Sequence, residues 1–399
     1  MNSPDFMFRF HTQVSMTAGN GLFRQLPSFL REKGYARPTV LVDEGFARSD
    51  LWRDVAANLQ REFGGVLNVR LNPGVAEPTY DGLRETLRGF QSLEQDVVVG
   101  IGGGSCMDTA KAVSALLTNP GDPLDYRGFD KLTRPGIPVV LIPTTAGTGS
   151  ESSFNASFVD TVGNRKMGIN GRYMFAAHAL LDGETTLSCP YRAALGAGID
   201  ALVHTLEGYV CKQRTPLSDM LARRAFAYLV PALPALKQDP HNLDRRLDLL
   251  LGAFLGGIIQ MNSGSGVAAA ISYPLSVYYK VPHGIGGGMF AVDMIKFNIE
   301  AGFDSYADLA PLIAIPSRAG SRVENAWSVH AHLQELWTIL EVPNKLSTFG
   351  IGPERRDHVL EIMKTQQPGF DQNPVPFTVA DHLPAFMEQY FQNTYVARN

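Results

Sequence analysis

An aspartate and two histidines have the residue types and the spacing to hold a metal ion. Asp200 and His204 stand four residues apart in GIDALVHTLEGY, and His283 follows in YYKVPHGIGGG. Residues i and i+4 of a helix share one face, one turn apart. This carboxylate and imidazole could therefore bind one metal ion, with His283 completing the site. Taken alone, such a pair is more often a helix salt bridge. The support for a metal site comes from the sequence upstream.

The upstream feature is a glycine-rich turn that follows an apolar run, DVVVGIGGGSCMDTAK. The three valines and the isoleucine predict a strand that is buried on both faces. Gly102, Gly103 and Gly104 then form a turn, and Ser105 stands where the N-cap of the next helix is expected. Free backbone N–H groups and the positive end of a helix dipole bind anions. A tight turn without a ligand is the alternative, but three glycines at a strand's end favour a pyrophosphate site, although the fingerprint G-x-G-x-x-G is absent.

The first half of the chain alternates strand and helix patterns. This alternation predicts a parallel sheet with helices on both faces, and phosphate groups bind such sheets at the carboxyl ends of the strands. Asp43 and the three glycines both lie at such ends. The expected helices are 22–32, 51–63, 80–91 and 107–117, and the expected strands are 38–42, 66–71, a strand near 98, and 137–142.

The second half of the chain has a different residue pattern. Long helical patterns cover 192–211, 217–236 and 244–261, and no repeat with a period of 20 to 50 residues is found. We therefore expect an α/β dinucleotide-binding domain at 1–186 and an α-helical metal and substrate domain at 187–399. The metal candidates belong to the second domain and the phosphate turn to the first. A small-molecule site would lie in the cleft between them.

Composition excludes several classes of protein. The chain has 399 residues, 45% of them apolar and 19% charged, with a net charge of −4. No lysine- and arginine-rich block is present, which argues against nucleic acid or membrane surfaces as partners. No signal peptide and no apolar stretch of about 18 residues is recognisable. We therefore expect a cytoplasmic protein. Three scattered cysteines favour free thiols. We separately expect a homodimer.

These features together resemble the iron-containing (group III) alcohol dehydrogenase family, which has the dehydroquinate-synthase-like fold. The resemblance rests on GGGSCMDTAKAV, PTTAGTGSE, LLDGETTLSCP, GIDALVHTLEGY and HGIGGGMFAVDMIKFN, which follow the family order over about residues 40 to 300. It implies an N-terminal domain that binds NAD or NADP, an all-helical C-terminal domain, and a divalent metal, iron or zinc, near the nicotinamide ring.

The resemblance also assigns roles to individual residues. Gly102, Gly103, Gly104 and Ser105 resemble the pyrophosphate-binding turn, and Asp43 matches an acidic residue beside the adenosine ribose. A carboxylate there accepts from a 2′-hydroxyl and repels a 2′-phosphate, which favours NAD over NADP. The other residues that the resemblance places at the cofactor are Asp108, Thr144, Thr145, Thr148, Ser150 and Lys166.

The chain departs from the family pattern at the metal site. The family has four protein ligands, the Asp-x-x-x-His pair and two histidines fourteen residues apart, but the position fourteen residues before His283 is Ala269. Many relatives also carry a non-ligating histidine at the position of Tyr273, which is thought to move protons. The hydroxyl of Tyr273 has an unperturbed pKa of about 10.

Two interpretations stay open. Asp200, His204 and His283 could hold a metal as three ligands with water or substrate in the open positions. In the other interpretation the metal is lost, and Tyr273 or His283 polarises the substrate carbonyl.

The leading hypothesis is an NAD(P)-dependent oxidoreductase that interconverts a small alcohol with an aldehyde or ketone. The metal would act as a Lewis acid, and the catalytic candidates are Tyr273 and His283. The phrase AISYPL at 270–275 resembles family branches that act on anionic aldehydes, such as phosphonoacetaldehyde reductases. The alternatives are a lyase or cyclase related to dehydroquinate synthase, which regenerates its NAD, and a non-catalytic relative that only binds the dinucleotide.

Overall fold

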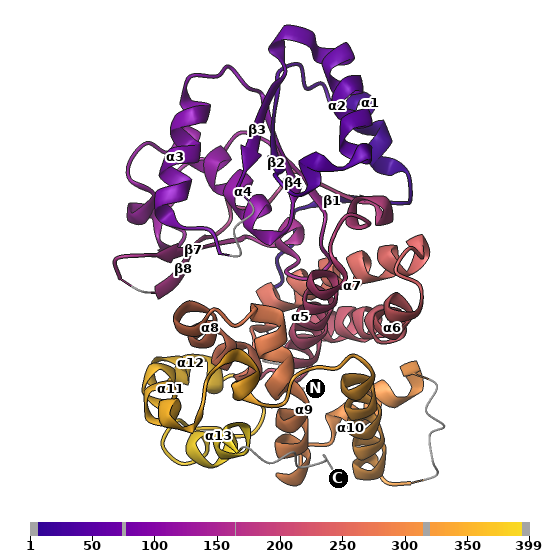
Figure 1. The fold of residues 1–399 in the computed structure, drawn as a ribbon, viewed down its shortest axis with the longest axis vertical. Coiled ribbons are helices and arrows are strands. Elements are labelled where there is room, and N and C mark those ends of the chain that lie inside the picture. The colour runs from indigo at the N-terminus through magenta and orange to yellow at the C-terminus, as the bar shows by residue number, and fades with distance from the viewer. Residues whose placement is uncertain (1–6, 74–76, 164, 314–319, 393–399) are drawn as a thin grey trace.

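The computed structural model describes residues 7–73, 77–163, 165–313 and 320–392. The chain folds into two parts stacked along its long axis, an upper α/β part built from the first half of the sequence and a lower part built from helices (Figure 1). This arrangement confirms the predicted fold class.

The upper part is organised around a six-stranded sheet in which all strand pairs are parallel. The strand order β1-β9-β6-β4-β2-β3 places β3 and β4 on opposite sides of β2. In open α/β sheets, ligands bind beyond the carboxyl ends of the strands where the strand order reverses, which is here the end of β2 and β4. The strands are β1 (Ser15–Ala18), β2 (Pro38–Asp43), β3 (Asn68–Asn72), β4 (Val97–Gly102), β6 (Val139–Pro143) and β9 (His178–Leu181).

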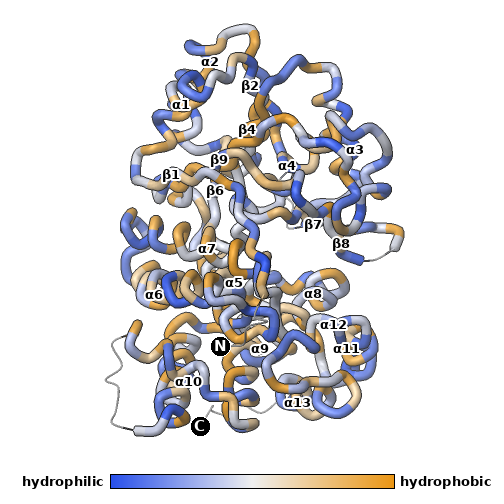
Figure 2. The backbone as a smooth tube through the Cα atoms, turned by 180° about the vertical axis from the view of Figure 1, so that it is seen from behind, coloured by the Kyte–Doolittle hydropathy of each residue, from blue (hydrophilic) through white to orange (hydrophobic). Residues whose placement is uncertain are grey.

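Helices cover both faces of this sheet because its central strands are apolar on both faces. In β2, Leu41 packs into one hydrophobic cluster together with α3 and α4, whereas Val40 and Val42 pack into another with α1 and α2. Figure 2 shows these central strands as largely hydrophobic. The helices are α1 (Leu26–Glu32), α2 (Asp50–Phe63), α3 (Tyr80–Gln91) and α4 (Gly104–Thr118).

A second, three-stranded sheet lies at the lower edge of the upper part and was not predicted. Its strand order is β5-β8-β7, and β8 lies next to α8 (Figure 1). Buried and partly exposed residues alternate in β7, so it lacks the continuous apolar run that reveals β2 and β4. The strands are β5 (Gly128–Phe129), β7 (Asn155–Asp160) and β8 (Arg165–Asn170).

Some predicted boundaries need correction. Strand 66–71 is displaced to β3 because 64–66 form a short 3-10 helix. Ser105 is not the N-cap of α4: Gly103 holds that position, and Gly104 already begins the helix. The edge strand β1 and its neighbour β9 were also missed, since each is only four residues long.

The lower part is entirely helical among its described residues. The three helices predicted there are confirmed to within about two residues at each end. Its α-helices are α5 (Tyr191–Val210), α6 (Pro216–Gln238), α7 (Leu243–Ser263), α8 (Val267–Tyr279), α9 (His283–Glu300), α10 (Arg322–Ile339), α11 (Arg356–Met363), α12 (Gln367–Phe370) and α13 (Leu383–Phe391). Across the described ranges, no helix alone has the length and apolar composition to span a membrane. The helices α7 and α8 reach that composition only jointly, and they are bent by 103° at their junction.

Candidate active site

Asp200, His204 and His283 converge at one point in the helical part. Asp200 and His204 lie one turn apart on α5, and His283 is the first residue of α9. The Nε2 atom of His204 lies 3.6 Å from Oδ1 of Asp200, and Nε2 of His283 lies 3.9 Å from the same oxygen. One donor atom from each residue lies within 4.8 Å of the other two. The tertiary structure therefore brings the predicted ligands together.

These three residues fit a divalent metal ion. Ligands about 2.1 Å from a tetrahedral ion are separated by about 3.4 Å, close to the spacing seen here. Burial lowers the pKa of His283 to about 4, against the opposing effect of Asp200, so its imidazole is neutral at pH 7 and keeps a lone pair for a metal. The buried Nδ1 of His204 has no hydrogen-bond partner among the described residues.

Ala269 lies on α8, the helix that runs beside this cluster. It is 2% exposed, and it lies one turn before Tyr273 on the same side of the helix. Its methyl group offers no donor atom to a metal. The described residues therefore present three protein ligands in this cluster.

Tyr273 packs against His283, the residue that sequence reasoning paired with it as a catalytic candidate. The two ring centroids lie 4.7 Å apart at an interplanar angle of 36°. Burial is the main cause that raises the pKa of Tyr273, and the nearby Asp200 and Glu207 raise it further. The hydroxyl therefore stays protonated at neutral pH and can donate a hydrogen bond.

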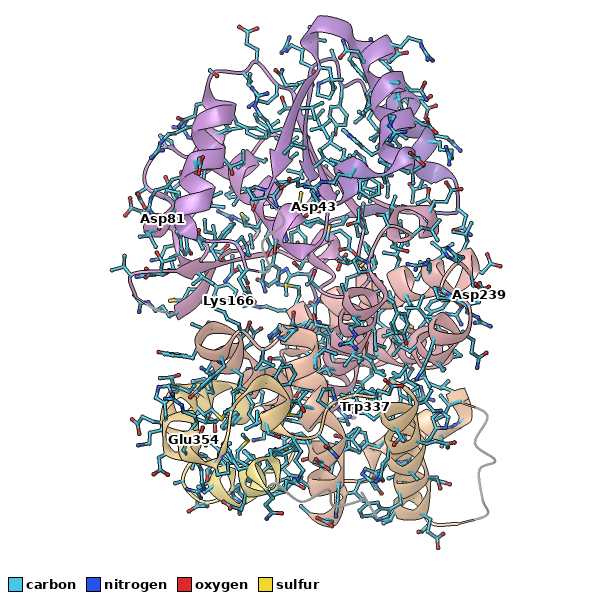
Figure 3. All side chains as sticks on the ribbon, viewed as in Figure 1. Asp43, Asp81, Lys166, Asp239, Trp337 and Glu354 are labelled. Atoms are coloured by element: carbon cyan, nitrogen blue, oxygen red, sulfur yellow. The ribbon has the colours of Figure 1, made fainter. Side chains whose placement is uncertain are left out.

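Lys166 connects the small sheet with the helical part. Its ammonium group lies 2.7 Å from Oε2 of Glu77, and Oε1 of Glu77 accepts a hydrogen bond of 3.0 Å from the hydroxyl of Ser276 on α8. Lys166 also lies 5.8 Å from the ring centroid of Tyr273. Figure 3 shows Lys166 at the junction of the upper and lower parts. Sequence reasoning missed Glu77, which no motif distinguishes from an ordinary loop carboxylate.

The glycine turn faces the threonine-rich loop that follows β6. A Cβ atom on Gly103 would lie 3.3 Å from Oγ1 of Thr145, and one on Gly104 would lie 2.8 Å from the side chain of Thr148. The backbone N–H of Thr144 donates to the carbonyl of Gly102, which ties the loop to the end of β4. These predicted residues therefore lie together around the first turn of α4, whose N-cap residue, Gly103, has no side chain.

Asp43 ends β2 beside this turn. A Cβ atom on Gly102 would lie 2.9 Å from the Cβ atom of Asp43, so only glycine allows the two strand ends to approach this closely. Oδ1 of Asp43 accepts hydrogen bonds from the backbone N–H groups of Gly45 and Phe46, at 2.9 and 3.4 Å. The carboxylate is thereby held at the carboxyl edge of the sheet.

Two other predicted cofactor residues bond to each other beneath the turn. The hydroxyl of Ser150 donates to Oδ1 of Asp108, and Oδ2 of Asp108 accepts from the backbone N–H of Ser157 at 2.8 Å. The buried ammonium group of Lys111 lies 3.3 Å from Asp108 and donates to the carbonyl of Ser150. This network fixes α4 against the threonine-rich loop.

The same loop contacts the helical part. Gly149 has a φ of 60°, and a Cβ atom there would lie 2.5 Å from the carbonyl oxygen of Ala253 on α7. Glycine is required at this position because both its conformation and the close approach exclude a side chain. The threonine-rich loop therefore contacts both the glycine turn and the helical part.

Glu207, one turn after His204 on α5, holds the beginning of α8. Its carboxylate accepts hydrogen bonds from the backbone N–H groups of Gly266, Ala268 and Ala269. Burial raises the pKa of Glu207 to about 7 despite these bonds. Sequence reasoning missed this residue, although it stands in the segment GIDALVHTLEGY.

One pocket of the described residues lies away from this site. It has a volume of about 400 Å³ and lies before the first residues of β6 and β9, next to Gln13, Ser114 and Arg172. None of the predicted cofactor or metal residues lines it.

The fold has two parts. One is a parallel α/β sheet with a glycine turn at its carboxyl edge, and the other is a set of helices that carry Asp200, His204 and His283. Residues 14–183 match the model of the iron-containing alcohol dehydrogenase family, and residues 194–390 match the model of the C-terminal part of that family. The chain belongs to the iron-containing alcohol dehydrogenase family, as its sequence motifs predicted, and is an oxidoreductase of that family.

Individual relatives agree with this assignment. The chain is 29% identical to the sulfoacetaldehyde reductase of Bilophila wadsworthia, over 87% of this chain and 90% of that protein. It is 30% identical to the NAD-dependent methanol dehydrogenase of Bacillus methanolicus, over 77% of this chain and 80% of that protein. The crystal structure of sulfoacetaldehyde reductase from Bifidobacterium kashiwanohense in complex with NAD+ has the same fold, with a TM-score of 0.85 and 21% identity over 98% of this chain and 100% of that one.

Proposed function

We propose that the protein is an NAD-dependent oxidoreductase that interconverts a small alcohol with its aldehyde or ketone in a cleft between the two parts. The observation that carries this proposal is the convergence of Asp200, His204 and His283 within 4.8 Å, in a chain of the iron-containing alcohol dehydrogenase family. The two family models adjoin between residues 183 and 194, which supports a domain boundary near residue 186.

The cofactor would lie along the carboxyl edge of the sheet. Its pyrophosphate would bind the first turn of α4 at Gly103, Gly104 and Ser105, because the N-cap residue Gly103 has no side chain that would occupy the positive end of the helix. Thr144, Thr145 and Thr148 surround this turn, and Asp108 and Ser150 hold their loop in place. When bound, the nicotinamide would accept or deliver the hydride.

The carboxylate of Asp43 favours NAD over NADP. Its charge lies at the end of β2, and its Oδ1 atom is already held by two backbone N–H groups. The other oxygen would accept from a ribose 2′-hydroxyl, whereas a 2′-phosphate would meet like charge. NADP stays the alternative cofactor.

Asp200, His204 and His283 would hold a divalent metal, iron or zinc, with Ala269 leaving the site one protein ligand short. A metal bound there would stabilise the alkoxide form of the substrate as a Lewis acid. Tyr273, which keeps its proton at neutral pH, would donate to or relay a proton from the substrate oxygen, and His283 would stay neutral beside it. Lys166 would contact the cofactor or an anionic substrate once Glu77 releases it.

The activities named for the relatives support a small aldehyde as the substrate of this protein, and one of them supports an anionic aldehyde. The Bilophila relative is a sulfoacetaldehyde reductase and the Bacillus relative a methanol dehydrogenase. The one ammonium group placed against Tyr273 among the described residues belongs to Lys166, and a cation there would attract a sulfonate or phosphonate group.

We also propose that the protein is a cytoplasmic homodimer. Its three cysteines are unpaired, as is usual in a reducing compartment. All four residues of β1 are exposed at one edge of the six-stranded sheet. An exposed edge strand presents unpaired backbone groups that a second copy can cover. Sedimentation of the purified protein measures this directly.

The test is turnover by protein purified without chelators, with elemental analysis of the same sample. We expect net oxidation of NADH with a panel of small aldehydes and about one metal ion per chain. A lyase that regenerates its NAD would give product without a net change in nicotinamide absorbance. A non-catalytic relative would bind NAD in a calorimeter and turn over no member of the panel. Either outcome would contradict the proposed oxidoreductase activity.

A further inference from the structure

Ser272 is a buried polar residue beside the metal cluster. It lies on α8 and is 1% exposed. Its hydroxyl oxygen lies 2.7 Å from the carbonyl oxygen of Ala269 and 2.8 Å from Nδ1 of His283. The side chain therefore joins the helix that lacks the fourth ligand to a residue of the cluster.

The hydrogen-bonding chemistry of the three groups favours one arrangement of their protons. A serine hydroxyl has one proton to donate, and a backbone carbonyl can only accept. The contact with Ala269 therefore uses the proton of Ser272, which leaves the serine oxygen as an acceptor towards His283. In this arrangement the ring of His283 carries its proton on Nδ1 and donates it to Ser272.

This assignment leaves the lone pair of His283 on Nε2. That nitrogen lies 3.9 Å from Oδ1 of Asp200, on the side of the ring that faces the cluster. Histidines that bind metals commonly donate their second N–H to such a partner, which fixes both the tautomer and the ring orientation. We infer that Ser272 is a positioning residue that holds His283 in its Nδ1–H tautomer and aims Nε2 at the proposed metal.

The packing of α9 makes this contact possible. A Cβ atom on Gly286 would lie 3.2 Å from the Cβ atom of Ser272, so a glycine there lets the first turn of α9 approach α8. His204 differs from His283, because the buried Nδ1 of His204 has no partner among the described residues. With Ala269 in place of a ligand, the orientation of His283 matters more for metal affinity.

The first test is the affinity of the purified full chain for Zn²⁺, measured by calorimetry in competition with a chelator. This test rests on the proposed function, because it needs a metal to bind. We expect Ser272→Ala to bind Zn²⁺ about 10–100-fold more weakly and Ser272→Thr, which keeps the hydroxyl, to bind within about threefold of wild type. Ser276→Ala is the matched control, because Ser276 lies one turn further along α8 and bonds to Glu77 instead. Equal affinity of wild type and a folded Ser272→Ala would overturn the inference.

The second test needs no metal and therefore separates the two proposals. In metal-free wild type labelled with ¹⁵N-histidine, the His283 signal, assigned with His283→Gln, should show a protonated Nδ1 and an unprotonated Nε2. Folded Ser272→Ala should lose this preference and Ser272→Thr should keep it. A protonated Nε2 in the wild type would overturn the role of Ser272 even if Zn²⁺ binds. If the spectrum shows the expected Nδ1–H tautomer but the protein does not bind Zn²⁺, the proposed metal site is wrong and the role of Ser272 in setting the tautomer is retained.

Discussion

Glu77 and Lys166 form an ion pair of 2.7 Å at the junction of the two parts of the molecule. The pair is mostly enclosed, with side-chain exposures of 22% and 14%. Glu77 also holds Ser276 on α8, so one carboxylate joins the small sheet to the helical part and neutralises the cation beside Tyr273.

Removal of this negative charge should favour anionic substrates. Glu77→Gln keeps the size of the side chain and can still bond to Ser276, but it leaves the charge of Lys166 uncompensated. We expect KM for sulfoacetaldehyde to fall by roughly 3–10-fold relative to KM for a neutral aldehyde of similar size, and the gain to shrink at high salt. Glu354→Gln removes an equal charge far from the junction, as Figure 3 shows, and is the control. An unchanged KM ratio would show that Lys166 does not meet the substrate anion.

A fourth ligand should strengthen the metal site. Ala269→His would place an imidazole on the face of α8 that also carries Tyr273. We expect the variant to bind Zn²⁺ at least about ten times more tightly than wild type, because the added imidazole supplies a fourth donor atom; tenfold corresponds to about 1.4 kcal/mol. Ala269→Leu is the control for bulk, since it fills the same space without a donor atom. If wild type and Ala269→His are both metal-free and equally active, the Lewis-acid role is wrong.

The charge of Asp43 should set the choice of cofactor. In Asp43→Asn the amide oxygen can still accept from Gly45 and Phe46, so the turn after β2 should persist. Without the negative charge, the ratio of kcat/KM for NADPH to that for NADH should rise by about tenfold or more. Glu44→Gln, the neighbouring position, removes a charge that pairs with Arg48 and should leave the ratio unchanged. Equal shifts in both variants would mean that Asp43 does not face the ribose.

A buried glutamate should make stability fall as pH rises. Burial raises the pKa of Glu151 to about 7, with Asp108 adding to the rise and Lys111 opposing it. Between about pH 4.5 and pH 7 the unfolded chain loses this proton while the folded chain keeps it, so folding stability declines across that window. The whole shift corresponds to at most about 3 kcal/mol. Glu151→Gln has no ionisable group at this position. The Tm of the variant minus the Tm of wild type should therefore rise by roughly 3 °C from pH 5 to pH 7.5.

The measurement for Glu151 is thermal unfolding of both proteins across that pH range. Glu151→Gln compared with Glu85→Gln, a surface position on α3, separates a buried proton from a general change in net charge. A constant difference in Tm between Glu151→Gln and wild type from pH 5 to pH 7.5 would contradict the prediction.

Local chemistry allowed much of the site to be predicted. Val97–Gly102 is a strand because its valines and isoleucine form a continuous apolar run, and the following glycines end it at the edge of the sheet. Asp200 and His204 share a helix face by their spacing alone. The same reasoning missed β1, β7, β8 and β9, since short or polar strands become stable only through their neighbours.

The sequence by itself therefore determined the elements whose patterns are local: the central strands, the long helices, the glycine turn and the spacing of two metal candidates. Only the tertiary structure decided which distant side chains meet. Ser272 reaches His283 because α9 packs closely on α8. Glu77 reaches Lys166 because Thr79 pairs with Val159 of β7, the residue that lies opposite Lys166 of β8. Contacts of this kind depend on how helices and sheets pack, and a single sequence carries no local signal for them.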